Sequence, residues 1–492
     1  MNEKLKILYV CSEIWPLVKT GGLADVAYGL TRALHRLGHD VRVALPCYGT
    51  ISTEQRGKQQ CVCVADIGFA TTFGALRASV VPGTTIPLYL IEHNLYYSRE
   101  HLYGTGEAEY MDNLERFCFF SLATLHGVPQ TGWAPDIVHC NDWHTALIPA
   151  YIKIRELHHP IWRKKPTVFT IHNLGYQGRF SATYFPFTGL GWDLFRPDCL
   201  EFHGDINLMK GGIAFADRVN TVSPTYAKEI LTPEHGDGLE GFLQEHHPDI
   251  KGILNCVDYA VWNPASDPSL ASTYSPDRLA GKALCKKALQ EELGLPQRDV
   301  PVFAMITRMV WHKGLDVVGA ALDALLQRDL QLVVLGAGDP QLERRFAESA
   351  GAHPDAMRVR IAFDEALAHR ILAGADFVLM PSHYEPGAVT QLLALKYGAI
   401  PIARKTGVFA DTIRDCADDH DAPCGTGFLF EGVTADALLG AVNRATELFR
   451  DTPHLEAVRR TGMTEDFSWE RSARQYLDLY RDAIASPCRT SL

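Results

Sequence analysis

A chain of 492 residues is too long for one compact core, and its length predicts two to three domains. Hydrophobic residues make up 47% and charged residues 21%, a composition that excludes disordered and fibrous proteins and favours a packed globular one. The formal net charge of -11 argues against general binding to nucleic acid or anionic membranes, because both need an excess of Lys and Arg.

Membrane and secretory segments are not expected. The apolar run near the N-terminus is only about five residues long, and no stretch approaches the roughly 18 apolar residues of a membrane helix. Twelve cysteines are scattered along the chain without a CxxC pair. We therefore expect reduced thiols rather than disulfides or structural zinc, and a cytoplasmic location.

The first part of the chain has a strand, helix, strand pattern. LKILYVC at 5–11 and VRVALP at 41–46 are typical of buried strands, and LADVAYGLTRALHRLG between them has apolar residues at three- and four-residue spacing. Three later runs, DIVHCND, TVFTIHN and RVNTVSP, are also typical of short strands that end in polar residues. We predict a Rossmann-like N-terminal domain at 1–257.

A second alternation of strands and helices follows. Residues 258–298, rich in Pro, Ser and Asp, are predicted to be a linker with a lead-in helix. Strands such as PVFAMITR and FVLMPS then alternate with helices up to residue 466, and FSWERSARQYLDLYRDAI predicts a closing helix within 467–492. The pattern indicates an α/β protein with doubly wound parallel sheets, the second in a C-terminal Rossmann-like domain at 299–466.

Ligands of open parallel sheets bind beyond the carboxyl ends of the strands. Two such domains facing each other would form a cleft lined by those ends. The unusual polar residues all follow predicted strands, at 19–22, 141–144, 172–173, 308–313 and 385–387. This placement favours a site in the predicted cleft.

The stretch LVKTGGLA at 17–24 places a lysine and two glycines before a helix. A tight turn and a cradle for an anionic group both fit this stretch when it is viewed alone. In ITRMVWHKGLD, Arg308 and Lys313 are two cations beside a strand end, which suits a diphosphate that gains charge as it leaves. A preorganised cation of this kind stabilises a transition state by roughly 3 to 4 kcal/mol. A solvated basic loop is the alternative for this second stretch.

A helix is predicted to begin near Pro386 and to end at Gly398. Its free backbone N–H groups would favour phosphate. Glu385 would either complement the helix dipole or accept hydrogen bonds from sugar hydroxyls. His172 and Asn173 end another predicted strand. A lone histidine is more often structural, but the neighbouring amide and aromatic residues favour sugar recognition.

Other motifs are discounted. LGAGD has Gln341 where a dinucleotide fingerprint needs its third glycine. Asp419, His420 and Asp421 give a DxD pattern in a polar loop without a preceding strand, and a solvated loop is favoured there. His139, Asp142 and His144 have spacing that suits a metal, but a loop that faces substrate is preferred. No metal and no cofactor are therefore expected.

Together these segments resemble bacterial glycogen synthase and plant starch synthase, the retaining glucosyltransferases of GT-B fold that extend α-1,4-glucan from ADP-glucose. The resemblance covers nearly the whole chain and implies the GT-B fold, with two Rossmann-like domains facing a central cleft. The segments that carry it stand in the family's order: KTGGLADV, HCNDWHTAL, TIHNLGYQG, INLMKGGIAFADRVNTVSPTYAKEI, GDGLEGFL, GILNCVDYAVWNP, TRMVWHKGLD and EPGAVTQLLALKYG.

The resemblance also implies roles for individual residues. His172 corresponds to the residue that hydrogen-bonds the donor glucose near its reacting carbon, Arg308 and Lys313 to the pair that neutralises departing ADP, and Glu385 to the glutamate at the donor sugar. These four are the implied catalytic residues. The implied substrate-binding residues, with the diphosphate contact first, are Lys19, Gly21, Gly22, Asp25, Asn173, Asn255 and Gly387.

The implied reaction is transfer with retention, in which the terminal 4-hydroxyl of the glucan attacks from the face that ADP leaves. Protein cations would stabilise the leaving group without a metal. The two domains are expected to close over the donor and exclude water. The implied partners are ADP-glucose and glycogen, with no nucleic acid and no membrane.

The chain also departs from the family pattern. Where the family usually has EPCGL this chain has EPGAV at 385–389, and where it usually has TGGL this chain has TGVF at 406–409. Cys256 replaces the glycine common in GILNG. The side chain of Ala388 or Val408 would hinder donor binding if the backbone there needed a positive φ or a close approach to phosphate.

Two alternatives therefore stay open. One is a related GT-B transferase that uses UDP-glucose or another acceptor, because nothing in the sequence selects the nucleotide base. The other is a glucan-binding protein that has lost turnover through the departures. An active enzyme is favoured because the chain retains Lys19, His172, Arg308, Lys313 and Glu385.

Overall fold

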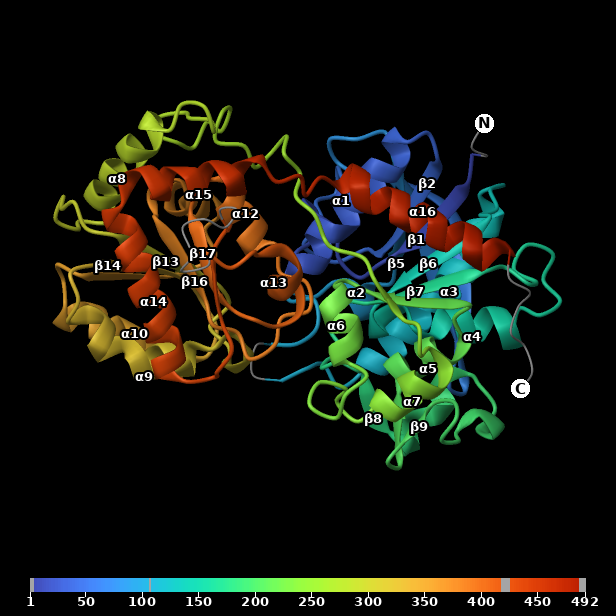
Figure 1. Cartoon of the computed structure of the whole chain (residues 1–492). Helices are drawn as coiled ribbons and strands as arrows, with labels where there is room; N and C mark the ends of the chain where they lie inside the picture. The colour runs from blue at the N-terminus through green and yellow to red at the C-terminus, as the bar shows by residue number, and fades with distance from the viewer. Residues whose placement is uncertain (1–3, 106–107, 417–424, 486–492) are drawn as a thin grey trace. The chain divides into compact units, whose positions relative to one another are not determined.

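A computed structural model describes residues 4–105, 108–416 and 425–485 of the chain (Figure 1). The chain forms two compact units. The first comprises Met1–Asn255 together with Trp469–Leu492, and the second comprises Cys256–Ser468. The stretch at 258–298 thus lies in the second unit, whereas the C-terminal helix lies in the first. No helix among the described residues is long and apolar enough to cross a membrane.

The first unit contains a nine-stranded sheet in the order β12-β11-β7-β6-β1-β2-β5-β4-β3. Its strands are parallel except β4, which runs antiparallel to both β3 and β5. The chain starts at β1, adds strands on one side, and then crosses to β6 on the other. The strands are β1 (Lys6–Val10), β2 (Asp40–Pro46), β3 (Lys58–Ile67), β4 (Ala70–Val80), β5 (Pro87–Glu92), β6 (Ile137–Asn141), β7 (Thr167–Ile171), β11 (Arg218–Thr221) and β12 (Lys251–Gly252).

Helices cover both faces of this sheet. Ile7, Leu8, Tyr9 and Val10 of β1 are fully buried, as expected of a parallel strand covered on both sides. A second, three-stranded sheet has the order β8-β10-β9, with β8 at Arg179–Ser181, β9 at Glu201–Phe202 and β10 at Asp205–Asn207. The α-helices are α1 (Gly22–Arg36), α2 (Asn94–Tyr97), α3 (Asn113–Gln130), α4 (Leu147–Ile154), α5 (Leu208–Phe215), α6 (Pro224–Glu229), α7 (Glu240–His246) and α16 (Trp469–Ala485).

The C-terminal helix α16 packs on α1, as the red and blue helices of Figure 1 show. Gly29 of α1 faces the indole of Trp469, which begins α16, and a Cβ at position 29 would overlap that ring. Further along α16, the hydroxyl of Tyr480 lies 2.8 Å from Nδ1 of His139 in β6. Helix α16 is therefore anchored in the core of the first unit.

The second unit contains a six-stranded, all-parallel sheet in the order β15-β14-β13-β16-β17-β18. The strand order reverses between β13 and β16, which gives the 3-2-1-4-5-6 order of a Rossmann fold. The strands are β13 (Val302–Ile306), β14 (Gln331–Gly336), β15 (Met357–Ile361), β16 (Phe377–Met380), β17 (Ile400–Arg404) and β18 (Phe428–Phe430).

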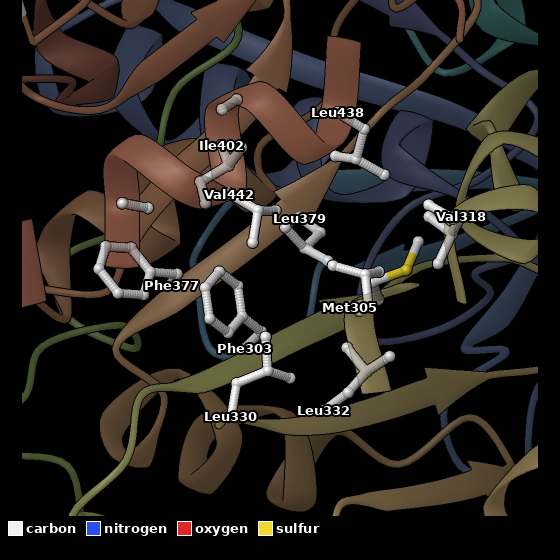
Figure 2. Packing of buried hydrophobic residues seen from close by; sticks show 14 of the residues in the cluster. Phe303, Met305, Val318, Leu330, Leu332, Phe377, Leu379, Ile402, Leu438 and Val442 are labelled. Carbon is white, nitrogen blue, oxygen red and sulfur yellow. The ribbon is translucent and has the colours of Figure 1, made fainter. Parts of the chain in front are cut away.

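Alternation along these strands builds a core on each face of the sheet. Phe303 and Met305 of β13 point to one face, where Figure 2 shows them with Leu379 and Val442. Ala304, between them, faces α8 and α11 with Val333. The helices are α8 (Ala280–Glu292), α9 (Leu315–Leu326), α10 (Pro340–Ala352), α11 (Glu365–Gly374), α12 (Thr390–Lys396), α13 (Gly407–Thr412), α14 (Ala435–Arg450) and α15 (Thr452–Thr464).

The stretch before α8 is held on this unit by an aromatic and polar cluster. The ring of Trp262 stacks on His369 of α11 with centroids 3.7 Å apart. Oδ2 of Asp267 accepts a hydrogen bond from the Tyr397 hydroxyl at 2.6 Å and lies 2.6 Å from Nδ1 of His369. These contacts explain why the Pro- and Asp-rich stretch is ordered despite having little regular structure.

Candidate active site

In the second unit, the predicted site residues follow β13 and β16, the two strands between which the sheet order reverses. That position is where open α/β sheets bind ligands. Lys313 ends a short 3-10 helix at Trp311–Lys313, and Gly314 follows with φ +73. A Cβ at position 314 would overlap the carbonyl oxygen of Pro381, so glycine lets the loop after β13 lie against the loop after β16.

Lys313 and Glu385 form an ion pair at this position. Nζ of Lys313 lies 2.6 Å from Oε2 of Glu385, and the Ser382 hydroxyl donates to the same oxygen at 3.0 Å. Glu385 is buried, with 4% of its surface exposed. Burial in a low-dielectric environment strengthens such a pair compared with a surface one, and its hydrogen bonds hold both side chains in place. The structure thus brings together two of the four predicted catalytic residues.

Further contacts join the two loops. The backbone N–H of His383 donates to the carbonyl of His312 at 2.8 Å. Nε2 of the His383 ring lies 2.9 Å from Oδ1 of Asp316. The indole of Trp311 stacks on the His383 ring at 4.3 Å. Arg308 is different, because it is exposed and its guanidinium forms no hydrogen bond or ion pair within the described residues. It is a cation that remains available to a ligand.

The helix predicted to begin near Pro386 begins later, at Thr390, and that prediction was wrong. In a helix with Pro386 in its first turn, the Glu385 carbonyl would accept the first intrahelical hydrogen bond. Instead it accepts from the backbone N–H of Val408 at 3.0 Å, while the side chain of Gln391 donates to the carbonyl of Ala388 at 2.8 Å. These bonds hold residues 386–389 in a non-helical loop.

In the first unit, the loop after β1 carries the predicted LVKTGGLA site. Lys19 and Asp25 form an ion pair at 2.8 Å, with 22% of the lysine side chain and 34% of the aspartate side chain exposed. Helix α1 begins at Gly22, with Gly21 as its N-cap in an extended conformation. A Cβ at Gly21 or Gly22 would meet no described atom within 4 Å, and neither has a positive φ. Packing within the unit does not require these glycines, whereas the close approach of a ligand to the backbone would.

Glu13 organises this turn, although no motif in the sequence indicated this role. Its Oε2 accepts from the backbone N–H groups of Thr20 at 2.5 Å and Gly21 at 3.3 Å, and its Oε1 accepts from the Thr20 hydroxyl at 2.6 Å. The hydroxyl of Tyr103 also donates to Oε1, at 2.8 Å. A carboxylate directly beyond the end of β1 was the available signal, but its partners could not be read from spacing.

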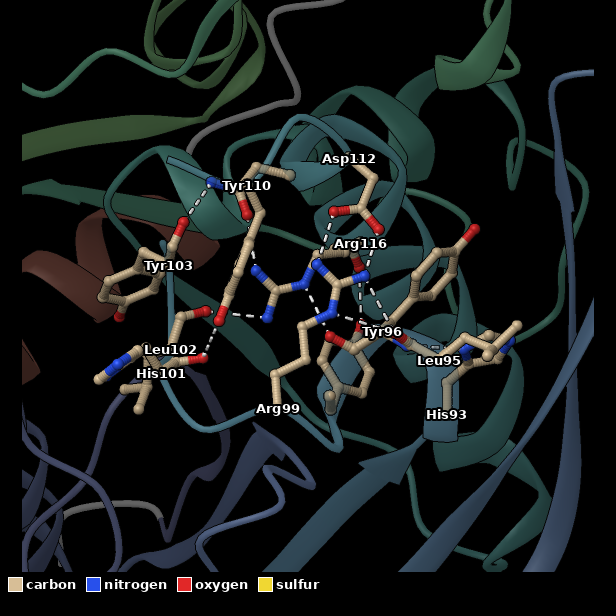
Figure 3. A network of polar contacts seen from close by, with 12 residues as sticks. His93, Leu95, Tyr96, Arg99, His101, Leu102, Tyr103, Tyr110, Asp112 and Arg116 are labelled. Atoms are coloured by element: carbon tan, nitrogen blue, oxygen red, sulfur yellow. Dashed lines mark hydrogen bonds and ion pairs between the residues drawn. The ribbon is translucent and has the colours of Figure 1, made fainter. Parts of the chain in front are cut away.

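Tyr103 lies on a loop that two arginines shape (Figure 3). Arg116 of α3, fully buried, donates to the carbonyls of Tyr96 and Leu102 at 2.8 Å each. Arg99 forms two hydrogen bonds with the carboxylate of Asp112. A buried guanidinium that satisfies several carbonyls rigidifies an irregular segment. These contacts therefore hold the loop in the conformation that places the Tyr103 hydroxyl against Glu13.

The loops after β6 and β7 meet in the same unit. Oδ1 of Asp142 accepts from the backbone N–H of His172 at 2.8 Å, and Nε2 of His172 lies 2.9 Å from Oδ1 of Asn141. Asp142 has φ 55, a rare conformation for a non-glycine residue, which these contacts hold in place. Burial raises the pKa of Asp142 to about 7 and lowers the pKa of His172 to about 3. His172 is therefore neutral near pH 7.

The remaining predicted residues have varied surroundings. Oδ1 of Asn173 accepts from the N–H of Gly175 at 2.9 Å, so this side chain shapes its own turn. Asn255 is buried and is the last residue of the first of the two segments that make up the first unit. Gly387 lies in the non-helical loop after Glu385.

The structure describes one of the two discounted metal motifs, the one formed by His139, Asp142 and His144. His139 contacts Tyr480 and Thr170 in the core, while His144 stacks on Trp143, so the two histidines do not converge. The described residues contain no group of three or more His, Cys, Asp or Glu that could hold a metal. The DxD pattern at 419–421 lies outside the described residues.

Two protein-family models together match most of the chain. The model of the starch synthase catalytic domain matches residues 6–245, and that of glycosyl transferases group 1 matches residues 287–457. Glycogen synthase of Anaeromyxobacter dehalogenans strain 2CP-C is 46% identical over 479 residues, covering 97% of this chain and 99% of the relative. Glycogen synthase of Moorella thermoacetica is 44% identical over 487 residues, covering 98% of each chain.

The chain belongs to the glycogen and starch synthase family. It is a glucosyltransferase that extends glucan chains, and its fold is GT-B. The catalytic domain of starch synthase IV from Arabidopsis thaliana, solved bound to ADP and acarbose, superposes with a TM-score of 0.90 at 34% identity, covering 98% of this chain and all of that one. Sucrose-phosphate synthase from Thermosynechococcus elongatus, 17% identical with a TM-score of 0.61, shares the fold.

The departures of this family member from the usual pattern do not strain its backbone. Ala388, Val408 and Cys256 are absent from the described residues with positive φ, whereas Gly407 has φ 43. Val408 is fully buried and its N–H donates to the Glu385 carbonyl, so its side chain packs inside the unit. The conformational objection to these substitutions therefore does not apply.

Proposed function

We propose that this family member transfers glucose from ADP-glucose to the terminal 4-hydroxyl of an α-1,4-glucan, with retention of configuration. The observation that carries the proposal is the second-unit cluster of cations, in which Lys313 is paired with buried Glu385 and Arg308 remains available. The Arabidopsis starch synthase IV domain that it resembles was solved with ADP and acarbose bound, which supports a nucleotide donor and a glucan acceptor.

Arg308 and Lys313 would stabilise the diphosphate as the bond from glucose C1 to the phosphate oxygen breaks. The bond from the glucan 4-oxygen to C1 would form on the same face, while the hydroxyl proton passes to the departing phosphate oxygen, which gives retention. Fixed cations act there without reorganisation, because Lys313 is already held by Glu385. Glu385 would also accept hydrogen bonds from donor hydroxyls. This set of roles requires no metal and no cofactor.

In the first unit, Lys19 and the backbone at Gly21 and Gly22 would contact the donor diphosphate. The open space beside both glycines supports this role, and the pairing of Lys19 with Asp25 sets the direction of the lysine. His172 would hydrogen-bond the donor glucose as a neutral ring, since its pKa of about 3 excludes proton donation from an imidazolium near pH 7. Asn173, Asn255 and Gly387 are the further proposed contacts.

We also propose a cytoplasmic location. All ten cysteines in the described part of the chain are free thiols, nine of them buried. Free thiols in this number are typical of a reducing compartment.

The donor is tested by supplying the purified protein with glycogen and either ADP-glucose or UDP-glucose, with and without EDTA. We expect ADP release matched by chain growth, faster turnover with ADP-glucose, and no effect of EDTA. Faster turnover with UDP-glucose would contradict the donor assignment. Binding of glycogen without nucleotide release from either donor would show a glucan-binding protein instead.

A further inference from the structure

We propose that Asn141 is a positioning residue that selects the tautomer of His172, with the proton on Nε2, so that Nδ1 meets the donor sugar as a hydrogen-bond acceptor. The identity of the sugar rests on the proposed function, whereas the tautomer does not. The argument starts from the orientation of the Asn141 amide.

Asn141 ends β6 and is fully buried. Its Nδ2 donates to the carbonyl of Val10 in the neighbouring strand at 3.0 Å, and its Oδ1 accepts from the hydroxyl of Tyr9 at 3.0 Å. The reverse amide orientation would place two oxygen acceptors, Oδ1 and the Val10 carbonyl, against each other. Oδ1 is therefore the atom that faces His172.

The position of the His172 proton follows from this orientation. Nε2 lies 2.9 Å from Oδ1 of Asn141, and an amide oxygen can only accept, so Nε2 carries hydrogen. A neutral imidazole has one such proton, which leaves a lone pair on Nδ1. Within the described residues Nδ1 forms no hydrogen bond, and His172 is only partly buried. The free acceptor on the ring is thus available to a ligand.

A hydrogen bond to its backbone also holds His172 in place. Asp142 accepts from the His172 N–H, which anchors the residue at the end of β7. Among the described residues, Tyr9 shares the Asn141 oxygen with the ring and Asp142 contacts its backbone, while His139 and His144 lie close enough to interact with it electrostatically. Burial raises the pKa of Tyr9 and lowers those of both histidines, so Asp142, with a pKa of about 7, is the one among them that titrates near neutrality.

The tautomer determines which kind of ligand group the His172 ring can bind. An acceptor at Nδ1 binds a sugar hydroxyl that donates its proton, and it repels a group that can only accept. The opposite tautomer would make the reverse choice. Asn141, which does not need to touch the substrate, would in this way determine the polarity of a contact to the donor.

The tautomer can be measured by nitrogen NMR on the full chain labelled with ¹⁵N-histidine, with the His172 signals assigned by their absence in His172→Gln. We expect the Nε2-protonated form in the unmodified protein. Asn141→Ala should give a mixture of tautomers, and kcat/KM for ADP-glucose should fall about tenfold, the effect of losing one hydrogen bond. Tyr9→Phe is the matched control, because it removes the other donor to Oδ1, and it should keep the single tautomer.

Protonation on Nδ1 in the unmodified protein would overturn the proposal without any variant. An unchanged tautomer in folded Asn141→Ala would also overturn it. Asn141→Asp keeps an acceptor for Nε2–H, so recovery of the single tautomer in this variant would support the proposal. If the protein transferred no glucose from any donor, the proposed function would fail while the tautomer measurement would still decide the role of Asn141.

Discussion

The ion pair of Lys313 and Glu385 joins two loops of the second unit that are 72 residues apart in the sequence. Lys313 follows β13 and Glu385 follows β16, the strands at which the sheet order reverses. Each residue was predicted from its own motif. Their contact at 2.6 Å shows that the buried carboxylate holds the lysine ammonium in one place.

Lys313→Ala should lower kcat at least about 100-fold, because a preorganised cation at a leaving diphosphate contributes roughly 3 to 4 kcal/mol. The measurement is the steady-state rate of ADP release, with circular dichroism to confirm folding. Lys405→Ala is the matched control, since Lys405 follows β17 and pairs with Glu431 on the surface, where both side chains are more than half exposed. Near-normal turnover of folded Lys313→Ala would remove this residue from the site.

Asp142 predicts a dependence of stability on pH. Its pKa is raised from 3.8 to about 7 by burial, so the folded protein keeps the proton over a range in which the unfolded chain has lost it. The contribution of Asp142 to the free energy of unfolding is therefore fully present below its ordinary pKa, decreases as pH rises to about 7, and is then constant. Asp142→Asn should flatten this part of the profile, as measured by urea unfolding across the range. An unaltered slope in the variant would show that other groups cause it.

The residues missed by sequence reasoning act through distant partners. Glu13 and Tyr103 are 90 residues apart, and Glu13 draws its importance from holding Thr20, Gly21 and Tyr103 at once. A carboxylate after a strand was visible in the sequence. The hydrogen-bond donors to Glu13 could not be predicted, because hydrogen bonds between loops leave no periodic pattern in the sequence.

At the scale of elements, hydrophobic spacing predicted the helices and strands that lie near the site. The helix predicted from Leu23 onward is α1, and the closing helix predicted within 467–492 is α16. The start of α12 was wrong because Pro386 is a local signal for a first turn, while the hydrogen bond from Val408 to the Glu385 carbonyl comes from a distant loop. The partner of α16 was likewise not readable from its own pattern.

Gly29→Ala should destabilise the first unit by about 1 to 3 kcal/mol, the usual cost of overpacking. The methyl group would overlap the indole of Trp469, and this cost exceeds the roughly 1 kcal/mol that alanine gains over glycine in a helix. Urea unfolding followed by tryptophan fluorescence measures the change. Gly241→Ala in α7 is the control, because a Cβ there meets no described atom within 4 Å, and it should be neutral or stabilising. Equal stability of Gly29→Ala and the parent would contradict the packing of α16 on α1.

At the scale of the whole molecule, both large sheets have the same plan. In each, the chain begins in the middle, adds strands on one side and crosses to the other. The proposed site residues other than Asn255 follow the strands beside the reversal or their neighbours. The alternation of strands and helices predicted this class correctly, since parallel strands require crossover helices. The comparisons with glycogen synthases confirm the family that the ordered motifs indicated.

By itself, the sequence determined the α/β class, the family and the loops that carry the chemistry, because hydrophobic periodicity, turn residues and motif order are properties of neighbouring residues. Only the tertiary structure decided which polar groups share a carboxylate, which nitrogen of His172 carries the proton, and whether Ala388 and Val408 strain the backbone. Those properties depend on contacts between segments far apart in the chain, and such contacts exist only once the sheets have formed.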